Sequence, residues 1–162
     1  MTRLAFLSPD AAPFVSPLSR ALADDAAGLV TDVSSLGKLE VRGDLGRLRT
    51  EPGEELIRIT STRGLLVCES PTTAARDRLA AAGFRVYDLT AGLAAFEVEG
   101  EALLRRLTEL DLEALPAVGA IARGTPALIQ RRGGERFRLF VPQELGHFVV
   151  EVVLDLAQGL AR

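Results

Sequence analysis

Two aspartates, Asp32 and Asp88, stand in the same local sequence and are the first candidates for chemistry. Each is followed by a hydrophobic residue and then by a hydroxyl residue, Ser34 in the first case and Thr90 in the second. This pattern favours hydrogen bonds from the side chain to the local backbone, which fix turns and strand ends. The same pair could instead line a cleft shared by two similar halves and contact the polar edge of a ligand. The residues leave both interpretations open.

Arginines cluster at a second place, around a pair of adjacent glycines. Arg131 and Arg132 precede residues 133–134, and Arg136 and Arg138 follow them. A charged tip on a β-hairpin is usually solvated, and it discourages pairing between sheet edges. A guanidinium group also binds a carboxylate through two parallel hydrogen bonds. Arg131, Arg132 and Arg136 are therefore candidate contacts to an acidic surface of a partner protein.

Other reactive side chains are few, because the sequence has one histidine, His147, and one cysteine, Cys68. His147 lies about 100° from the apolar face of a predicted helix and next to Glu144 and Glu151, which indicates a solvated surface residue. Cys68 follows residues 66–67 in an apolar strand, where a free cysteine behaves as a small buried hydrophobe. Single residues of these types exclude a disulfide framework and most metal-ligand or nucleophile arrangements. We expect no catalytic residue and no metal site in this chain.

The glycines give no support to nucleotide chemistry. Glycines at positions 37, 43 and 46 fit neither the spacing of a P-loop nor that of a dinucleotide-binding fingerprint. We therefore expect that the isolated chain binds neither flavin nor NAD.

The composition limits the class of protein. Of 162 residues, 48% are hydrophobic and 25% are charged, which is typical of a globular chain. The net charge of -3 comes from acidic and basic residues in mixed order, so we expect no broad nucleic-acid-binding surface. No apolar run approaches the ~18 residues of a membrane span, and the first apolar run is too short for a signal sequence. We expect a cytoplasmic protein without membrane contact.

Hydropathy and turn residues indicate the elements that must position these side chains. Residues 1–28 contain Pro9, Pro13 and Pro17, which predict an extended arm followed by a short helix. Period-two alternation then predicts strands, and recurrence of apolar residues every three or four positions predicts helices. The predicted strands include 29–34, 38–42, 56–59, 65–68, 126–131 and 135–141, and the predicted helices are 70–82, capped by Ser70, then 101–110 and 142–160.

A repeat organises these elements. Residues 30–43 and 86–100 share the order strand, turn, strand and glycine, and both end in Glu-Val-x-Gly. The sequence therefore predicts a single α+β domain at 29–162, in which helices pack on antiparallel sheets. We expect this domain to consist of two pseudo-repeated β-β-α-β-β-α halves, 29–83 and 84–162.

Several stretches of the chain resemble one protein family. Residues 110–129, which read LDLEALPAVGAIARGTPALI, and residues 32–43, which read DVSSLGKLEVRG, resemble the gamma subunits of heterotetrameric sarcosine oxidases. Residues 16–18 and 137–142 fit the same pattern, and the order and spacing of all four stretches agree with it. The second stretch is also similar to the folate-binding domain of the glycine-cleavage T-protein family. The chain departs from the gamma pattern in having no tryptophan, and in having Glu113 where a histidine often stands.

This resemblance implies a fold, a role and partners. The fold would be of the folate-binding-domain type, and the chain would be an accessory, non-catalytic subunit that aids assembly of a flavin-dependent amine-oxidising complex. Flavin, NAD and folate would then be bound by the larger subunits, and no cofactor would be bound by this chain.

Two alternatives stay open beside it. The first is a stand-alone folate-binding or one-carbon-transfer protein, which holds tetrahydrofolate between the halves with Asp32 or Asp88 at the ring nitrogens. The second is a module that forms a homodimer when isolated.

Overall fold

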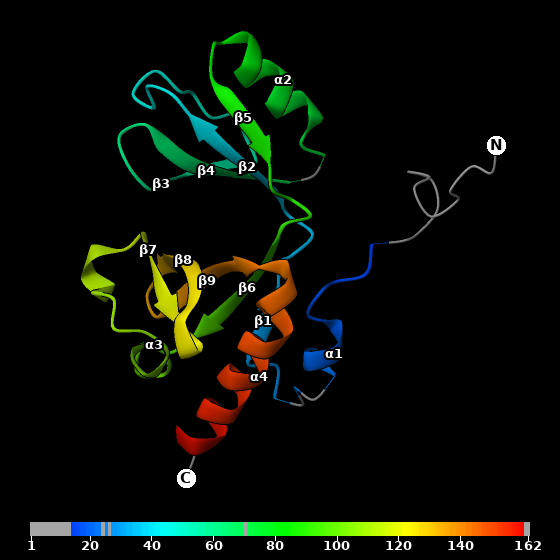
Figure 1. Ribbon diagram of the computed structural model, residues 1–162. Coiled ribbons are helices and arrows are strands. Elements are labelled where there is room, and N and C mark those ends of the chain that lie inside the picture. Colours follow the sequence, from blue (N-terminus) through cyan, green and yellow to red (C-terminus); the bar gives the residue numbers. More distant parts are fainter. Residues whose placement is uncertain (1–13, 24, 26, 70, 161–162) are drawn as a thin grey trace, which may run out of the picture.

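The computed structural model describes residues 14–160, except residues 24, 26 and 70. The described part of the predicted arm contains a short helix, α1 (Ser19–Leu22), whose Ala21 is buried, and residues 1–13 of that arm lie outside the described range. Figure 1 shows the rest of the chain as two lobes, each built on one antiparallel sheet.

A four-stranded sheet carries one helix on its outer face. Its strands follow the order β3-β4-β2-β5, and α2 (Thr73–Ala81) packs on them. The strands are β2 (Gly37–Arg42), β3 (Glu54–Arg58), β4 (Arg63–Cys68) and β5 (Arg85–Asp88). The predicted helix over 70–82 therefore begins later than expected, and its predicted cap, Ser70, lies outside the described residues. Thr72 stands at the N-cap without a capping hydrogen bond from its side chain.

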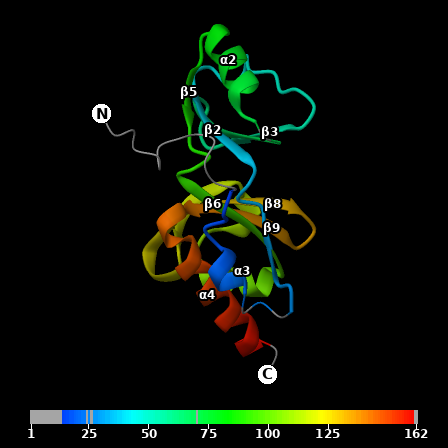
Figure 2. The same cartoon turned by 90° about the vertical axis from the view of Figure 1, so that its right-hand side faces the viewer.

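A five-stranded sheet carries the other helices. Its order is β1-β6-β9-β8-β7, and the helices α1, α3 (Glu101–Leu107) and α4 (Gln143–Leu160) cover its outer face, as the two views in Figures 1 and 2 show. The strands are β1 (Val30–Asp32), β6 (Leu93–Glu99), β7 (Ala117–Ile121), β8 (Thr125–Gly133) and β9 (Arg136–Pro142). Short 3-10 turns, Leu112–Ala114 and Ala122–Gly124, flank β7.

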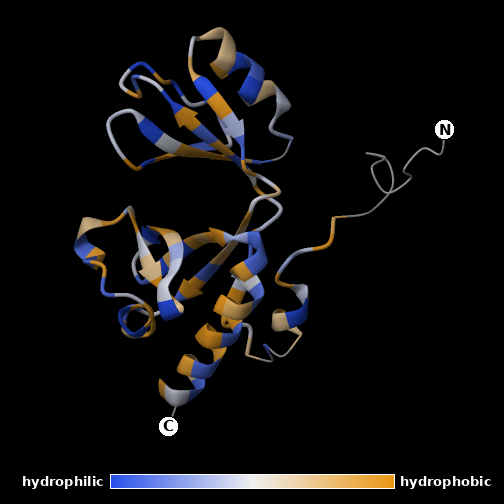
Figure 3. Ribbon diagram, in the orientation of Figure 1, coloured by the Kyte–Doolittle hydropathy of each residue, from blue (hydrophilic) through white to orange (hydrophobic). Residues whose placement is uncertain are grey.

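The molecule has four layers, because the inner faces of the two sheets pack against each other. Alternate residues of each strand point to opposite faces, so Leu39 of β2 packs under α2 while Leu65 of β4 meets the other sheet. Phe140 of β9 is part of this middle layer, and its neighbour Leu139 packs under α4. Figure 3 shows hydrophobic and hydrophilic residues side by side on α4, as expected for a helix with one buried face.

The two halves of the chain exchange strands. β1 from the first half pairs with β6, with Val30 opposite Val98, and β5 from the second half pairs with β2, with Val86 opposite Val41. The order β5-β2-β4-β3 in one sheet thus corresponds, strand for strand, to the order β1-β6-β9-β8 in the other. The element order differs from the predicted β-β-α-β-β-α in each half. In the described residues, no helix separates β2 from β3, whereas α3 and β7 both stand between β6 and β8.

Helix α4 approaches the sheet closely through Gly146. A Cβ atom at this position would lie 2.7 Å from the Cβ of Ala94 and 2.8 Å from a methyl group of Leu18. The buried face of the helix is therefore centred on residues 146, 149, 150 and 153. The apolar spacing predicts a face formed by residues 145, 148, 149, 152, 156 and 160. Of these, Val149 is fully buried, but Leu145 and Phe148 are only partly buried and Leu160 is exposed.

Candidate functional site

The two aspartates fix the turns at which the chain crosses between the sheets. An Asp32 carboxylate oxygen accepts a hydrogen bond from the backbone N–H of Ser34 at 2.9 Å, and Asp88 makes the same bond with the N–H of Thr90 at 2.9 Å. The hydroxyl of Thr72 donates to the other oxygen of Asp88 at 2.7 Å. Burial raises the pKa of Asp88, but the hydrogen bonds from Thr90 and Thr72 outweigh it and lower the pKa overall. Both carboxylates thus make the local bonds of the structural interpretation.

A buried lysine lies next to these two turns. Lys38 on β2 has no exposed surface, and its ammonium nitrogen donates to the carbonyl oxygens of Ser34 and Leu36 at 2.7 and 2.8 Å. Burial lowers the pKa of Lys38 to about 8, although the negative charges of Asp32 and Asp88 oppose this shift. The two crossing turns are therefore coupled electrostatically through one side chain.

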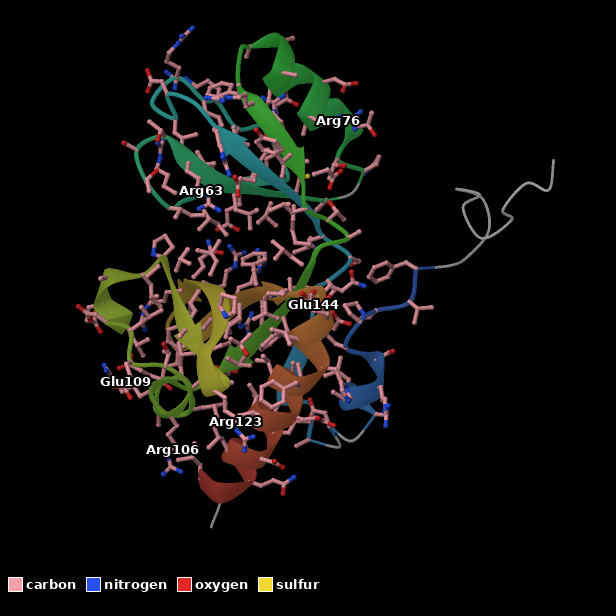
Figure 4. The ribbon with its side chains drawn as sticks, in the orientation of Figure 1. Arg63, Arg76, Arg106, Glu109, Arg123 and Glu144 are labelled. Atoms are coloured by element: carbon pink, nitrogen blue, oxygen red, sulfur yellow. The ribbon has the colours of Figure 1, made fainter. Side chains whose placement is uncertain are left out.

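A second buried ionic group lies further along β2. Glu40 is 6% exposed and accepts hydrogen bonds from Arg42 at 2.5 Å and from Arg63 at 2.8 Å. Burial alone would raise the pKa of Glu40, but the hydrogen bonds from Arg63 and Arg42 lower it below its ordinary value. Glu40 therefore stays ionised and holds the guanidinium group of Arg63 in place. Figure 4 shows Arg63 on the side of the four-stranded sheet that faces the other lobe.

Beside Arg63, the two sheets leave a pocket of about 210 Å³ between them. Glu40, Arg63 and Leu65 line it from the four-stranded sheet, and Leu128 and Phe140 line it from the five-stranded sheet. The remaining lining residues are Ile59, Leu89, Leu93, Val118, Pro126, Ala127 and Pro142. The pocket is thus apolar except for one carboxylate and one guanidinium group. We call it the intersheet pocket.

An ionic network joins the sheets elsewhere in the same layer. Arg138 on β9, which is 7% exposed, pairs with Glu97 at 2.7 Å and with Glu55 of the other sheet at 3.3 Å. Arg132 also pairs with Glu55, and Gln130 donates to Glu55 at 2.5 Å. We call these five residues the intersheet network, and their charges compensate one another across the interface.

Comparisons with known proteins identify the fold. One chain of the heterotetrameric sarcosine oxidase from Corynebacterium sp. U-96, solved in complex with pyrrole 2-carboxylate, superposes with a TM-score of 0.75. The alignment covers 92% of this chain and 97% of that chain, at 17% sequence identity. The fold is that of a sarcosine oxidase chain. No family model matches the sequence, and no curated protein sequence matches it.

The sarcosine oxidase-like fold also occurs within a larger protein. The glycine-cleavage aminomethyltransferase T from Bartonella henselae aligns with 77% of this chain at a TM-score of 0.54 and 15% identity. That alignment covers 45% of the aminomethyltransferase, so this chain spans less than half of it. Among the described helices, none is long and apolar enough to cross a membrane.

The three candidate arginines for partner binding differ in their surroundings. Arg131 pairs with Glu101 at 3.2 Å, and its guanidinium group lies 4.7 Å from the centre of the Phe137 ring. Arg132 belongs to the intersheet network. Arg136 is exposed and makes no ion pair with any residue that the structure describes. The structure therefore brings Arg131 and Arg132 into contacts within the chain, and it leaves Arg136 at the surface.

The structure also describes the surroundings of the other two reactive side chains that the sequence offers, His147 and Cys68. His147 is 32% exposed at its side chain and lies 3.2 Å from Glu151, so it is half-buried rather than fully solvated. Cys68 is buried, and burial raises the pKa of its thiol, which disfavours the reactive thiolate. No cluster of three or more potential metal ligands occurs among residues 14–160 as described.

Sequence reasoning missed the residues that shape the middle layer, namely Lys38, Glu40 and Arg63. Lys38 and Glu40 alternate with Leu39 and Val41, a pattern that predicts a polar face in water. A second sheet covers that face instead. The one available signal was composition, because Lys38 is the only lysine in a chain rich in arginine.

Proposed function

We propose that this chain is a gamma-type accessory subunit of a sarcosine oxidase-like, flavin-dependent amine-oxidising complex, in which it aids assembly. The proposal rests on how much of the two chains can be aligned. The alignment covers nearly all of this chain and nearly all of one chain of a heterotetrameric enzyme. A shared whole-chain fold of this kind is an argument by analogy about function. It favours a subunit with larger partners over an unrelated domain of similar topology.

The chemistry of the described residues supports a non-catalytic role. Asp32, Asp88 and Glu40 already accept hydrogen bonds within the chain, and the thiol of Cys68 is buried. We propose that flavin, NAD and folate are bound by the larger subunits, because this chain has no dinucleotide fingerprint. A cytoplasmic location stays a prediction from the sequence.

The experiment is isolation of the native complex. The chain, tagged at its genomic locus, is purified from the native cell at its natural level, and its partners, absorbance spectrum and amine-dependent peroxide production are measured. We expect larger chains in fixed stoichiometry, flavin absorbance that belongs to them, and oxidation of sarcosine or a similar secondary amine. A chain that purifies alone, or that carries stoichiometric flavin by itself, contradicts the proposal.

The likeness to the aminomethyltransferase supports one alternative, a stand-alone folate-binding protein. The purified chain is titrated with tetrahydrofolate, and the Asp32→Asn and Asp88→Asn variants are compared with it. Saturable binding that either variant abolishes, without a change in the melting temperature, would favour this alternative. The accessory role predicts no such binding.

The strand orders of the two sheets correspond to each other, and this supports a finer proposal. We propose that residues 29–83 and 84–160 are related halves. An experimental structure tests it by superposition of residues 30–43 on residues 86–100. Different local folds in these two segments would end the claim.

A further inference from the structure

The size of the intersheet pocket restricts what it can hold. Its volume of about 210 Å³ is enough for several water molecules. Pockets for drug-sized ligands and cofactors have volumes of about 300 to 1,000 Å³. The space between the sheets therefore suits the body of a compact molecule rather than a whole flavin or dinucleotide.

The pocket walls determine which part of such a molecule they contact. Leu65 lines the side of the four-stranded sheet, Leu89 lies in the turn between β5 and β6, and Leu93, Leu128 and Phe140 line the side of the five-stranded sheet. These side chains offer no hydrogen bond, so water inside the pocket would lose partners that it has in the bulk. An apolar body would displace that water favourably.

Among the described residues that line the pocket, Arg63 supplies the one cationic group. It shares a face of β4 with Leu65, two residues along the strand, so both point toward the five-stranded sheet. One terminal nitrogen of Arg63 donates to Glu40. Its Nε and its other terminal nitrogen have no hydrogen-bond partner among the described residues, and the side chain is 48% exposed. The guanidinium group is thus fixed by one hydrogen bond to Glu40, and its other N–H groups are available to a ligand.

The charges around Arg63 favour an anion. Glu40 is ionised but is compensated by both Arg42 and Arg63, so these three residues carry one net positive charge. A polar depression next to the pocket is lined by Arg42, Arg63 and Arg85, with Asp44 as its acidic residue. The chain as a whole has a net charge of -3, so this positive region runs against its average.

We propose that the intersheet pocket binds a compact carboxylate with an apolar body. The body lies between the sheets against Leu65, Leu128 and Phe140, and the carboxylate accepts hydrogen bonds from the free donors of Arg63. Arginine is suited to this contact, because its planar group presents paired donors that match a carboxylate. This site lies within the chain itself and does not depend on the proposed partners.

Binding of 2-naphthoate to the purified full-length chain tests the proposal by calorimetry. We expect one saturable site, and weaker binding of the uncharged 2-naphthamide, which has the same shape. Arg63→Gln should weaken naphthoate binding about tenfold or more, because a charge-assisted contact is lost. Leu65→Phe, which extends into the pocket, should weaken both compounds.

The matched control is Arg85→Gln, which removes a nearby arginine that lines the depression but not the pocket. It should leave naphthoate affinity within about twofold of the wild type, because general electrostatic attraction between exposed charges is weak. The proposal is overturned if no saturable binding occurs, or if Arg63→Gln and Arg85→Gln weaken binding equally. Thermal melting identifies any variant that fails to fold, and the comparison of naphthoate with naphthamide on the wild type then still decides the question. The result is independent of native purification, so failure of this site and failure of the accessory role are distinguishable.

Discussion

Lys38 is the residue whose surroundings differ most from what its type predicts. A lysine is almost never fully buried unless it is paired, yet this one has no exposed surface and donates to two backbone carbonyl oxygens. Burial destabilises the charged ammonium group because the group loses its hydration. The negative charges of Asp32 and Asp88 partly offset this loss. Because the lysine bonds to the turn that follows Asp32 and precedes its own strand, it stabilises the place where the chain enters the second sheet.

The lowered pKa of Lys38 predicts a stability that depends on pH. The pKa falls from 10.5 to about 8 on folding, so in that range the unfolded chain binds more protons than the folded chain. The free energy of unfolding should therefore rise with pH between about 8 and about 10.5. Denaturant titrations of the wild type and of Lys38→Met across this range measure the contribution as a difference between the two proteins.

The charged and titratable groups that face Lys38 are Asp32, Asp88 and Cys68. The raised pKa of Cys68 acts in the opposite direction, because the folded chain keeps its thiol proton at high pH. Cys68 is present in both proteins, so its effect largely cancels in the difference. Equal pH slopes for the wild type and Lys38→Met would show that the ammonium group is not destabilised by burial.

Local chemistry at the residue scale could be predicted where it depends on neighbours in sequence. The turns at Asp32 and Asp88 follow from an aspartate two positions before a serine or threonine. The burial of Lys38 and Glu40 depends on a sheet formed by residues far away in the chain. No local pattern indicates such a cover, so the candidate pocket could not be predicted either.

At the scale of elements, the contact of α4 with β6 depends on the absence of a side chain at Gly146. Replacing glycine by alanine inside an exposed helix stabilises it by about 1 kcal/mol. Here the new methyl group would meet the fully buried Ala94 at 2.7 Å. Overpacking of a core costs about 1–3 kcal/mol, so Gly146→Ala should destabilise the chain by about 1 kcal/mol overall.

Gly159 in the same helix provides the control, because among the described residues no atom outside its chain neighbours and the nearby helix backbone lies within 4 Å of a Cβ built there. Gly159→Ala should leave the melting temperature unchanged or raise it slightly. Melting of the two variants beside the wild type decides the matter, and a Gly146→Ala protein more stable than the wild type would mean that the helix moves away from β6 without cost.

Elements with strong local signals could be predicted from the sequence. The turn between β8 and β9 falls at the adjacent glycines 133 and 134, as predicted. Helix α4 spans nearly the range that its apolar spacing indicates. The predicted buried face of α4 includes Val149 correctly but omits Gly146, because glycine carries no hydropathic signal. The exchange of β1 and β5 between the sheets could not be predicted either. Alternation of apolar and polar residues indicates a strand but not the strand with which it pairs.

At the scale of the whole molecule, the intersheet network holds charged groups inside a mostly apolar layer. Glu97→Gln would leave Arg138 buried with only the longer contact to Glu55. Breaking a buried pair by removing one partner costs about 3–5 kcal/mol. Because Arg138 keeps its contact to Glu55, we expect a smaller loss of roughly 2–3 kcal/mol. Asp77→Asn, which breaks an exposed pair with Arg76, should change stability by less than about 0.5 kcal/mol. Denaturant unfolding of both variants measures the contrast, and similar losses would mean that the network adds nothing.

The accessory role predicts a surface that contacts larger partners, and Arg136 is the arginine of the hairpin that tests it cleanly. Arg136→Glu should reduce recovery of the larger chains in the native purification and leave the melting temperature nearly unchanged. Reversal at Arg131 or Arg132 would also break contacts within the chain, so those variants do not separate assembly from folding. Normal assembly of Arg136→Glu would exclude this residue from the interface.

The exchange of strands between the halves has a consequence for synthesis on the ribosome. The four-stranded sheet is complete once β5 has emerged, but β1 was made first and has no partner until β6 follows. Until β8 and β9 are also made, the apolar side chains of Ile57, Leu65 and Val67 on the finished sheet lack their contacts with Leu128 and Phe140. A nascent chain of this protein therefore presents an apolar sheet face while residues 89–142 are made, about a third of its length. We expect that a chaperone that binds exposed apolar surface would recognise this face during synthesis.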